Sequence, residues 1–378
     1  HMYPEIDFDM PKTVALIKRE LEAMGVPYTE QYGEGSVVGY INPDSKGFCI
    51  AIRADTDALK LDERVDVPYR SKHEGKMHAC GHDAHTAMLL GAAKVLKGME
   101  KDLKCRVKLL FQPSEEGMKS GSMMMIEHGV LDDVDVIIGQ HTANGIDVGT
   151  LAICPGESQA CSRHFKIEIE GRSAHAAQAH TGIDAIAVAF RMYSAIQLVL
   201  SREVPALERY LCSIGTIHAG TAQNNVADYA EMTGTIRTFS TKISALIFNR
   251  IEQIAKSLSE ETGAKITATG PLKSVCVYNN PYMSELMMNS MRKVTDSVRY
   301  FKIGMGSEDF SRYGEVVPAV FARVGTGSAE NRTAAHHGDY IICEEGLIYG
   351  VKNFVQFVAD YQNGIDKDKL AAADTREK

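Results

Sequence analysis

Apolar runs of strand length alternate with amphipathic helical segments through the first 140 residues. Each run is bounded by Gly, Pro or charged residues, which is typical of buried strands. The predicted strands are residues 36–41, 48–53, 106–111 and 134–138, and the predicted helices are residues 11–25, 84–98 and 118–129. Strands that alternate with helices predict an α/β domain with a mostly parallel sheet.

A different pattern begins near residue 163 and ends near residue 274. The order strand, helix, strand, strand, helix, strand predicts a ferredoxin-like βαββαβ unit. Its elements are expected at residues 165–170, 183–202, 209–217, 226–238, 242–262 and 265–269. We therefore expect a discontinuous α/β domain, residues 1–162 and 275–378, that carries an inserted domain, residues 163–274. The first domain resumes with a helix at 282–295.

Charge and composition exclude several classes of partner. The 378 residues include 41 Lys and Arg against 49 Asp and Glu, a net charge of −8, so we expect no nucleic-acid partner. No apolar run is long enough to span a bilayer, and no signal peptide is expected. The eight cysteines are irregularly spaced, which predicts reduced thiols and a cytoplasmic protein.

One cysteine lies among other metal-binding residue types. Cys80 and His82 flank a single glycine, and a thiolate with an imidazole is a favourable ligand pair for zinc and similar ions. The pair alone is weak evidence. Cys80 could instead be a nucleophile with a nearby histidine as its base.

Adjacent carboxylates follow the strand at 106–111. Glu115 and Glu116 cannot both be buried without a cation or a proton. If one binds a metal, its neighbour can act as general base on a water. The alternative is the charged first turn of a helix.

Further polar residues lie at the carboxyl ends of other predicted strands, which is where parallel sheets bind ligands. Asp55 and Asp57 either orient histidines or cap the next turn. His141 ends a buried-strand pattern, and the pair His336–His337 lies in a later loop. Together with Cys80, His82 and Glu116, these histidines approach the ligand set that two adjacent metal ions require.

The inserted domain contributes its own candidates. His175 lies just after a strand, and Asn225 enters another that ends near Arg237. An arginine at a strand end either extends to solvent or clamps a substrate carboxylate with two hydrogen bonds.

These motifs, in this order, resemble the aminoacylase/carboxypeptidase-type dimetal peptidases over nearly the whole chain. The nearest branch is the amidohydrolases, which include hippurate hydrolases, N-acyl-amino-acid deacylases and auxin–amino-acid conjugate hydrolases. The matching segments are His1-Met-Tyr-Pro-Glu5, Ala54–Leu59, Met77-His-Ala-Cys-Gly-His-Asp83, Gln112-Pro-Ser-Glu-Glu-Gly117, Gly139–His141, Gly171–Ala176, Gly234–Arg237, Gly306-Ser-Glu-Asp-Phe310 and His336–His337.

The resemblance implies a role for each matched residue. Glu115 would be the general base, and His175, on a lid and dimerisation domain, would polarise the scissile carbonyl. The implied ligands of two divalent ions (Zn, Mn, Co or Ni) are Cys80, His82, Glu116, His141 and His337. The implied substrate contacts are Asn225, Arg237, Ser307 and Glu308, and the supporting carboxylates are Asp55, Asp57 and Asp83.

The implied activity is metal-dependent hydrolysis of N-acyl amino acids by a homodimer or higher homo-oligomer. Departures from the branch at Gln178–His180, Asn225–Asp228 and Gly338–Asp339 affect the lid and pocket rim, and therefore the substrate assignment. The alternatives are a carboxypeptidase or dipeptidase on the same scaffold, a cysteine-dependent hydrolase, and a non-catalytic binding protein. The intact Glu115 argues against the last, since a binding protein needs no base.

Overall fold

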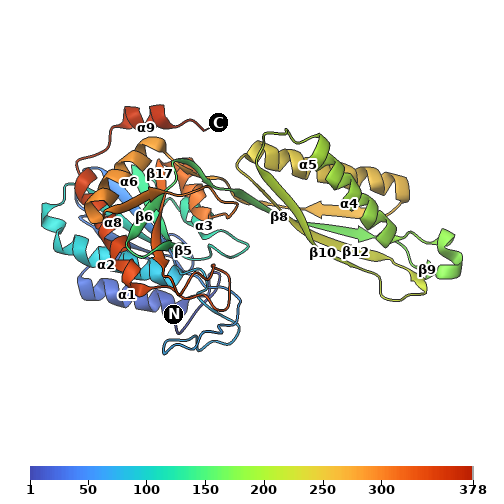
Figure 1. Cartoon of the computed structure of the whole chain (residues 1–378), viewed down its shortest axis with the longest axis horizontal. Helices are drawn as coiled ribbons and strands as arrows, with labels where there is room; N and C mark the ends of the chain where they lie inside the picture. Colours follow the sequence, from blue (N-terminus) through green and yellow to red (C-terminus); the bar gives the residue numbers. More distant parts are fainter. Residues whose placement is uncertain (377–378) are drawn as a thin grey trace. The chain divides into compact units, whose positions relative to one another are not determined.

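The computed structural model describes residues 1–376 and divides them into two compact units (Figure 1). The first unit comprises residues 1–158, 277–303 and 309 onward, and the second comprises residues 159–276 and 304–308. The segment 304–308 was expected in the first domain. It groups with the second unit because Gly304 bridges Gln159 and the Gly306 carbonyl accepts a hydrogen bond from the Ala160 N–H at 2.9 Å.

An eight-stranded sheet forms the centre of the first unit, in the order β1-β2-β4-β3-β5-β17-β6-β16. The adjacent strands β4, β3, β5 and β17 run parallel, which confirms the mostly parallel α/β fold. The strands are β1 (Tyr28–Thr29), β2 (Val37–Ile41), β3 (Cys49–Asp55), β4 (Arg106–Gln112), β5 (Val136–Asp147), β6 (Thr150–Ile153), β16 (Ser297–Tyr300) and β17 (Ala319–Gly327).

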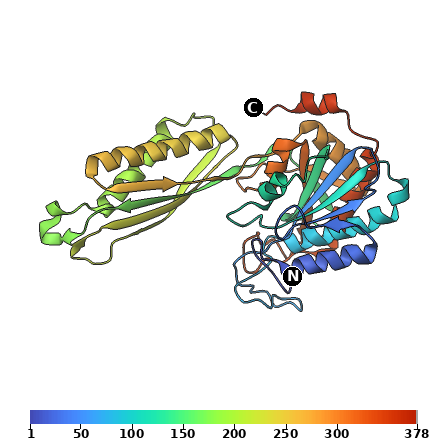
Figure 2. The same ribbon diagram turned by 180° about the vertical axis from the view of Figure 1, so that it is seen from behind.

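Helices cover both faces of this sheet (Figures 1 and 2). Successive residues of β3 belong to different cores, since Ile50 and Ile52 pack in one cluster and Cys49 and Ala51 in another. This alternation explains why four consecutive apolar residues, Cys49–Ile52, open the strand. The helices are α1 (Pro11–Met24), α2 (His82–Gly98), α3 (Gly121–Glu127), α6 (Pro281–Val294), α7 (Tyr313–Val316), α8 (Leu347–Tyr361) and α9 (Lys367–Ala373).

The second unit has an antiparallel sheet in the order β10-β12-β8-β13, with two helices on one face (Figure 1). Its apolar helix faces and inward-facing strand residues form a separate core. The elements are β8 (Cys161–Glu170), β9 (Ala174–His175), α4 (Ala185–Arg202), β10 (Tyr210–Ala219), β11 (Asn225–Val226), β12 (Tyr229–Thr238), α5 (Thr241–Thr262), β13 (Lys265–Thr269) and β14 (Leu272–Ser274). The order βαββαβ is the ferredoxin-like arrangement.

Among the described residues, no helix combines the length and the apolar character needed to cross a membrane.

Candidate metal centre

A tight turn delivers Cys80 and His82 to the same place. Gly81 has a φ of 86°, and a Cβ at this position would lie 2.5 Å from Thr142 Oγ1. Glycine is therefore required both for the backbone conformation and for the space. His82 begins α2, so both residues lie at the N-terminal end of this helix, where the helix dipole favours a thiolate.

The hydrogen bonds of His82 leave one ring nitrogen for a metal. Its Nδ1 lies 3.3 Å from Asp57 Oδ1 and therefore donates to this carboxylate. The other nitrogen, Nε2, is buried and has no hydrogen-bond partner among the described residues. A buried nitrogen lone pair without a donor is costly unless a cation binds it.

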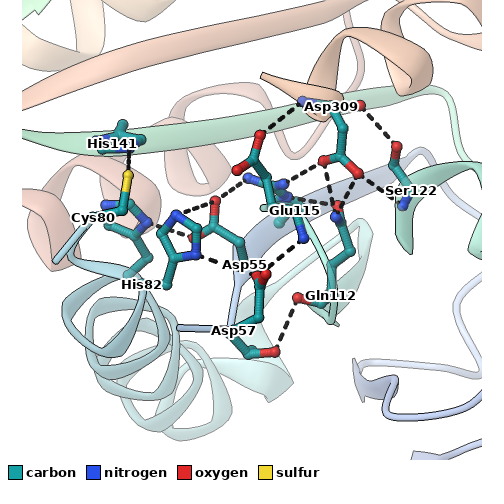
Figure 3. A network of polar contacts seen from close by, with 12 residues as sticks. Asp55, Asp57, Cys80, His82, Gln112, Glu115, Ser122, His141 and Asp309 are labelled. Carbon is teal, nitrogen blue, oxygen red and sulfur yellow. Dashed lines mark hydrogen bonds and ion pairs between the residues drawn. The ribbon is translucent and has the colours of Figure 1, made fainter. Parts of the chain in front are cut away.

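His141 has the same arrangement. It lies within β5, which runs beyond its predicted end at residue 138. Its Nδ1 donates to the Thr142 carbonyl at 2.6 Å, so the lone pair is on Nε2, which lies 3.4 Å from Cys80 Sγ (Figure 3). We conclude that His141 presents a ligand-competent nitrogen to the thiol.

His85 differs from these two histidines although it is also buried. Its Nδ1 donates to Asp55 at 2.5 Å, and its Nε2 accepts the Thr142 N–H at 2.9 Å. Both nitrogens are used, so His85 holds neighbouring groups in place and has no lone pair for a metal.

The two glutamates occupy a strained turn after β4. Ser114 has a φ of 52°, a conformation that is uncommon for a residue other than glycine and often found at functional sites. The Asp57 carboxylate accepts the N–H groups of Glu115 and Glu116, both at 3.0 Å. Asp57 thus fixes the backbone of both glutamates and also orients His82 (Figure 3).

The structure brings His336, rather than His337, to the cluster. The His336 N–H donates to the Ala79 carbonyl at 2.8 Å, and His336 Nε2 lies 2.9 Å from Glu116 Oε1. The His337 ring is half exposed and contacts Arg64. Two consecutive residues here point in different directions, because His336 has a φ of 63°. The structure therefore favours His336 over His337 as the histidine beside Glu116, and the ligand role of either residue stays a proposal.

The ligand atoms fit a metal site. Among the described residues, five groups of potential ligand atoms have all members within 4.8 Å of one another, and three of them each contain two of Cys80, His82 and Glu116. These three groups are Cys80 with His82 and His141, Cys80 with Glu116 and His336, and His82 with Glu115 and Glu116.

The charges of the cluster also call for a cation. Burial raises the pKa of the Cys80 thiol well above its usual value, so a thiolate here needs a bound cation. Burial lowers the pKa of His141 well below its usual value and keeps its ring neutral, as a ligand must be. Burial alone would raise the pKa of Glu116, but the hydrogen bond with His336 and the nearby His82 and His336 charges together outweigh this effect, and the pKa of Glu116 is lowered.

The supporting carboxylates have separate partners. Asp55 holds His85 and pairs with Arg53 at 2.6 Å. Asp83 was expected to support a ligand, and instead pairs with His1 at 2.6 Å.

The candidates of the second unit form two groups. His175 and Asn225 are paired neighbours on β9 and β11. Arg237 Nη1 donates a hydrogen bond to Ser307 Oγ. Glu308 is a buried carboxylate next in the chain. Their roles toward substrate remain predictions.

Comparison with known proteins identifies this arrangement. Residues 51–360 match peptidase family M20/M25/M40. The chain belongs to this family. It is therefore a hydrolase that acts on amide bonds, and the resemblance seen in the sequence is confirmed.

Relatives within the family are similar over most of their length. An N-acetyl-L-cysteine deacetylase of Bacillus subtilis (strain 168) is 37% identical over 352 residues, 92% of this chain and 83% of the relative. An IAA-amino acid hydrolase (ILR1-like 4) of Arabidopsis thaliana is 36% identical over 370 residues, 96% and 83% of the two chains. The crystal structure of the Bacillus subtilis YXEP protein, a dinuclear metal binding peptidase of family M20, has a TM-score of 0.77 at 30% identity and covers 95% of this chain and 94% of its own.

Proposed function

We propose that this chain hydrolyses the amide bond of N-acyl amino acids and releases the free amino acid. The geometry of Cys80, His82, Glu116, His141 and His336 around Glu115 is the observation that supports this proposal most strongly. The deacetylase and the IAA-amino acid hydrolase among the relatives act, by their names, on this class of compound.

In this mechanism, two divalent ions held by the five ligands would lower the pKa of a water and polarise the substrate carbonyl. Glu115 then accepts the proton of the attacking water and delivers it to the leaving nitrogen. The carboxylate suits this work because it is buried and because Asp57 holds its backbone in place. A thiolate–imidazole set favours zinc, while carboxylate and imidazole ligands also accept manganese, cobalt or nickel.

The second unit supplies substrate contacts from its two ends. Arg237 lies near the end of β12, whereas β9 lies beyond the start of β12 at Tyr229 (Figure 1). His175 belongs to β9 and pairs with Asn225 of β11. Between Tyr229 and Arg237 the strand alone covers about 26 Å at its usual rise per residue. A small substrate cannot reach both ends of one sheet. We therefore assign Arg237 to the substrate carboxylate in one subunit, and His175 and Asn225 to the site of a second copy.

An exposed apolar face supports the homodimer. Ile186, Phe190 and Tyr193 lie at helical spacing on α4 and remain 39%, 68% and 40% exposed. Beside them in the unit, β10 is an edge strand whose exposed Ile217 pairs with the buried Met232 and so lies on the helix-covered face of the sheet. A second copy of the same face would cover both features with a twofold, self-complementary contact.

The proposed substrate class can be tested with a panel of N-acetyl and N-benzoyl amino acids against dipeptides, after loading with each candidate metal. We expect hydrolysis of the N-acyl compounds and its loss with EDTA. Preference for dipeptides would instead support the carboxypeptidase or dipeptidase alternative. Activity that resists EDTA but is blocked by a thiol reagent would support a cysteine-dependent hydrolase.

A further inference from the structure

Asp309 is a buried carboxylate outside the ligand set. It follows the segment 304–308 and is only 1% exposed. Its Oδ1 accepts hydrogen bonds from Arg53 Nη2 at 2.8 Å and Gln112 Nε2 at 2.9 Å. Its Oδ2 accepts from Ser120 Oγ at 2.7 Å and the Ser122 N–H at 3.2 Å. Donors from β3, β4 and the start of α3 therefore fix this side chain in one orientation.

The main chain of Asp309 is held as well. Its carbonyl accepts a hydrogen bond from Ser122 Oγ at 2.8 Å. Its N–H donates to Glu115 Oε1 at 3.2 Å (Figure 3). The rigid residue thus directs a hydrogen-bond donor at one oxygen of the proposed general base.

Arg53 links this arrangement to the histidine side of the centre. Its buried guanidinium pairs with Asp309 at 2.8 Å and with Asp55 at 2.6 Å. Asp55 in turn accepts the hydrogen bond of His85 and lies 3.7 Å from His82 Nε2. The buried guanidinium of Arg53 therefore pairs with two buried carboxylates and offsets part of the cost of burying them.

We propose that Asp309 is a positioning residue for Glu115: its carboxylate, anchored by Arg53, Gln112, Ser120 and Ser122, holds its own N–H against Glu115 Oε1 and thereby fixes the carboxylate that moves the proton. This role rests on the proposed function, in which Glu115 is the general base. A proton acceptor must lie within hydrogen-bond reach of the water, and a misplacement of about 1 Å can lower the rate about 100-fold.

The direct test replaces the carboxylate by its amide. Asp309→Asn places a side-chain NH2 group among donors that need an acceptor, so the side chain is no longer held in place. The backbone N–H of residue 309, which donates to Glu115, is kept. We expect kcat per metal-loaded enzyme to fall about 10- to 100-fold, with KM and bound metal unchanged. An unchanged kcat would overturn the positioning role.

A milder pair of variants covers the case in which Asp309→Asn does not fold. Ser122→Ala removes the hydroxyl that donates to the Asp309 carbonyl. The control, Ser290→Ala, removes an equally buried hydroxyl on α6, which donates to Asp360 of α8 at 2.7 Å. Both should lower Tm to a similar degree. Only Ser122→Ala should lower kcat, about 3- to 10-fold, the effect of one hydrogen bond. Equal kcat in the two variants would reduce Ser122 and Asp309 to a structural role.

The reference variant Glu115→Gln separates the two proposals. Loss of turnover in Glu115→Gln, together with wild-type kcat in Asp309→Asn and Ser122→Ala, would overturn the positioning role and leave the proposed function standing. A wild-type enzyme that hydrolyses none of the panel, or full turnover in Glu115→Gln, would overturn both.

Discussion

Hydrogen bonds decide which histidines can bind metal. His82 and His141 each give one ring N–H to an oxygen acceptor and keep the other nitrogen for a ligand bond. His85 is as close to the centre but uses both nitrogens within the protein. Ligand identity at this site therefore depends on the acceptor behind each ring, because that acceptor fixes the tautomer.

The adjacent His336 and His337 form a matched pair that tests which histidine faces the cluster. His336→Ala should lower the bound metal and turnover, because it removes the imidazole that faces Glu116 and Cys80. His337→Ala should keep its metal, since the contacts of that ring with Arg64 and Asp339 are exposed to solvent. Elemental analysis of the two purified variants checks this. Metal loss in His337→Ala alone would return the ligand role to His337.

At the scale of elements, the centre depends on tight turns at the ends of a strand and a helix. Gly81→Ala should be strongly destabilising, because it adds a Cβ 2.5 Å from Thr142 Oγ1 to a backbone with φ of 86°. Gly75→Ala is the control: φ is 70°, but nothing lies within 4 Å of the added carbon.

We expect a loss of about 1 kcal/mol in unfolding free energy for Gly75→Ala, from the left-handed backbone alone. For Gly81→Ala, we expect about 2–4 kcal/mol and weaker metal binding, because strain and overpacking add. Denaturant unfolding and metal titration measure both effects. Equal losses of unfolding free energy in the two variants would show that a Cβ at position 81 can be accommodated beside Thr142.

The sequence predicts the elements well where a single pattern controls them. Three strands illustrate this: β3, β4 and the predicted strand at 265–269. Each can be recognised from the spacing of its apolar residues and from the residues that end the run. The end of β5 was placed too early, because hydrogen bonds with β17 continue the strand through His141 into polar sequence. The grouping of segment 304–308 with the second unit depends on contacts with residues 159–160, which no local pattern encodes.

The sequence motifs predicted the part of the candidate site that they contain. Cys80, His82, Glu116 and His141 come together, but the sequence alone could not choose between two consecutive histidines. Arg53 was missed, and Asp309 was matched only as part of the segment Gly306–Phe310, without a role of its own. A charged residue inside the apolar run of β3 was the available signal for Arg53, since a buried guanidinium requires carboxylate partners.

At the scale of the whole molecule, the proposed site needs two copies of the chain. Phe190→Glu should disrupt the dimer, because it places a charge at the most exposed aromatic residue of the α4 face. We expect the mass measured by light scattering to halve and turnover to fall, while metal binding persists because its ligands belong to the first unit. A monomeric wild type with full activity would contradict the assignment of His175 to a second copy.

The central claim is that this chain is a metal-dependent amidohydrolase in which Glu115 moves the proton. The most direct measurement compares N-acyl amino acid hydrolysis by metal-loaded wild type and Glu115→Gln, with bound metal determined on the same samples. We predict metal content close to wild type in the variant and turnover lower by at least about 100-fold. Wild-type turnover in a metal-loaded Glu115→Gln enzyme would contradict the account.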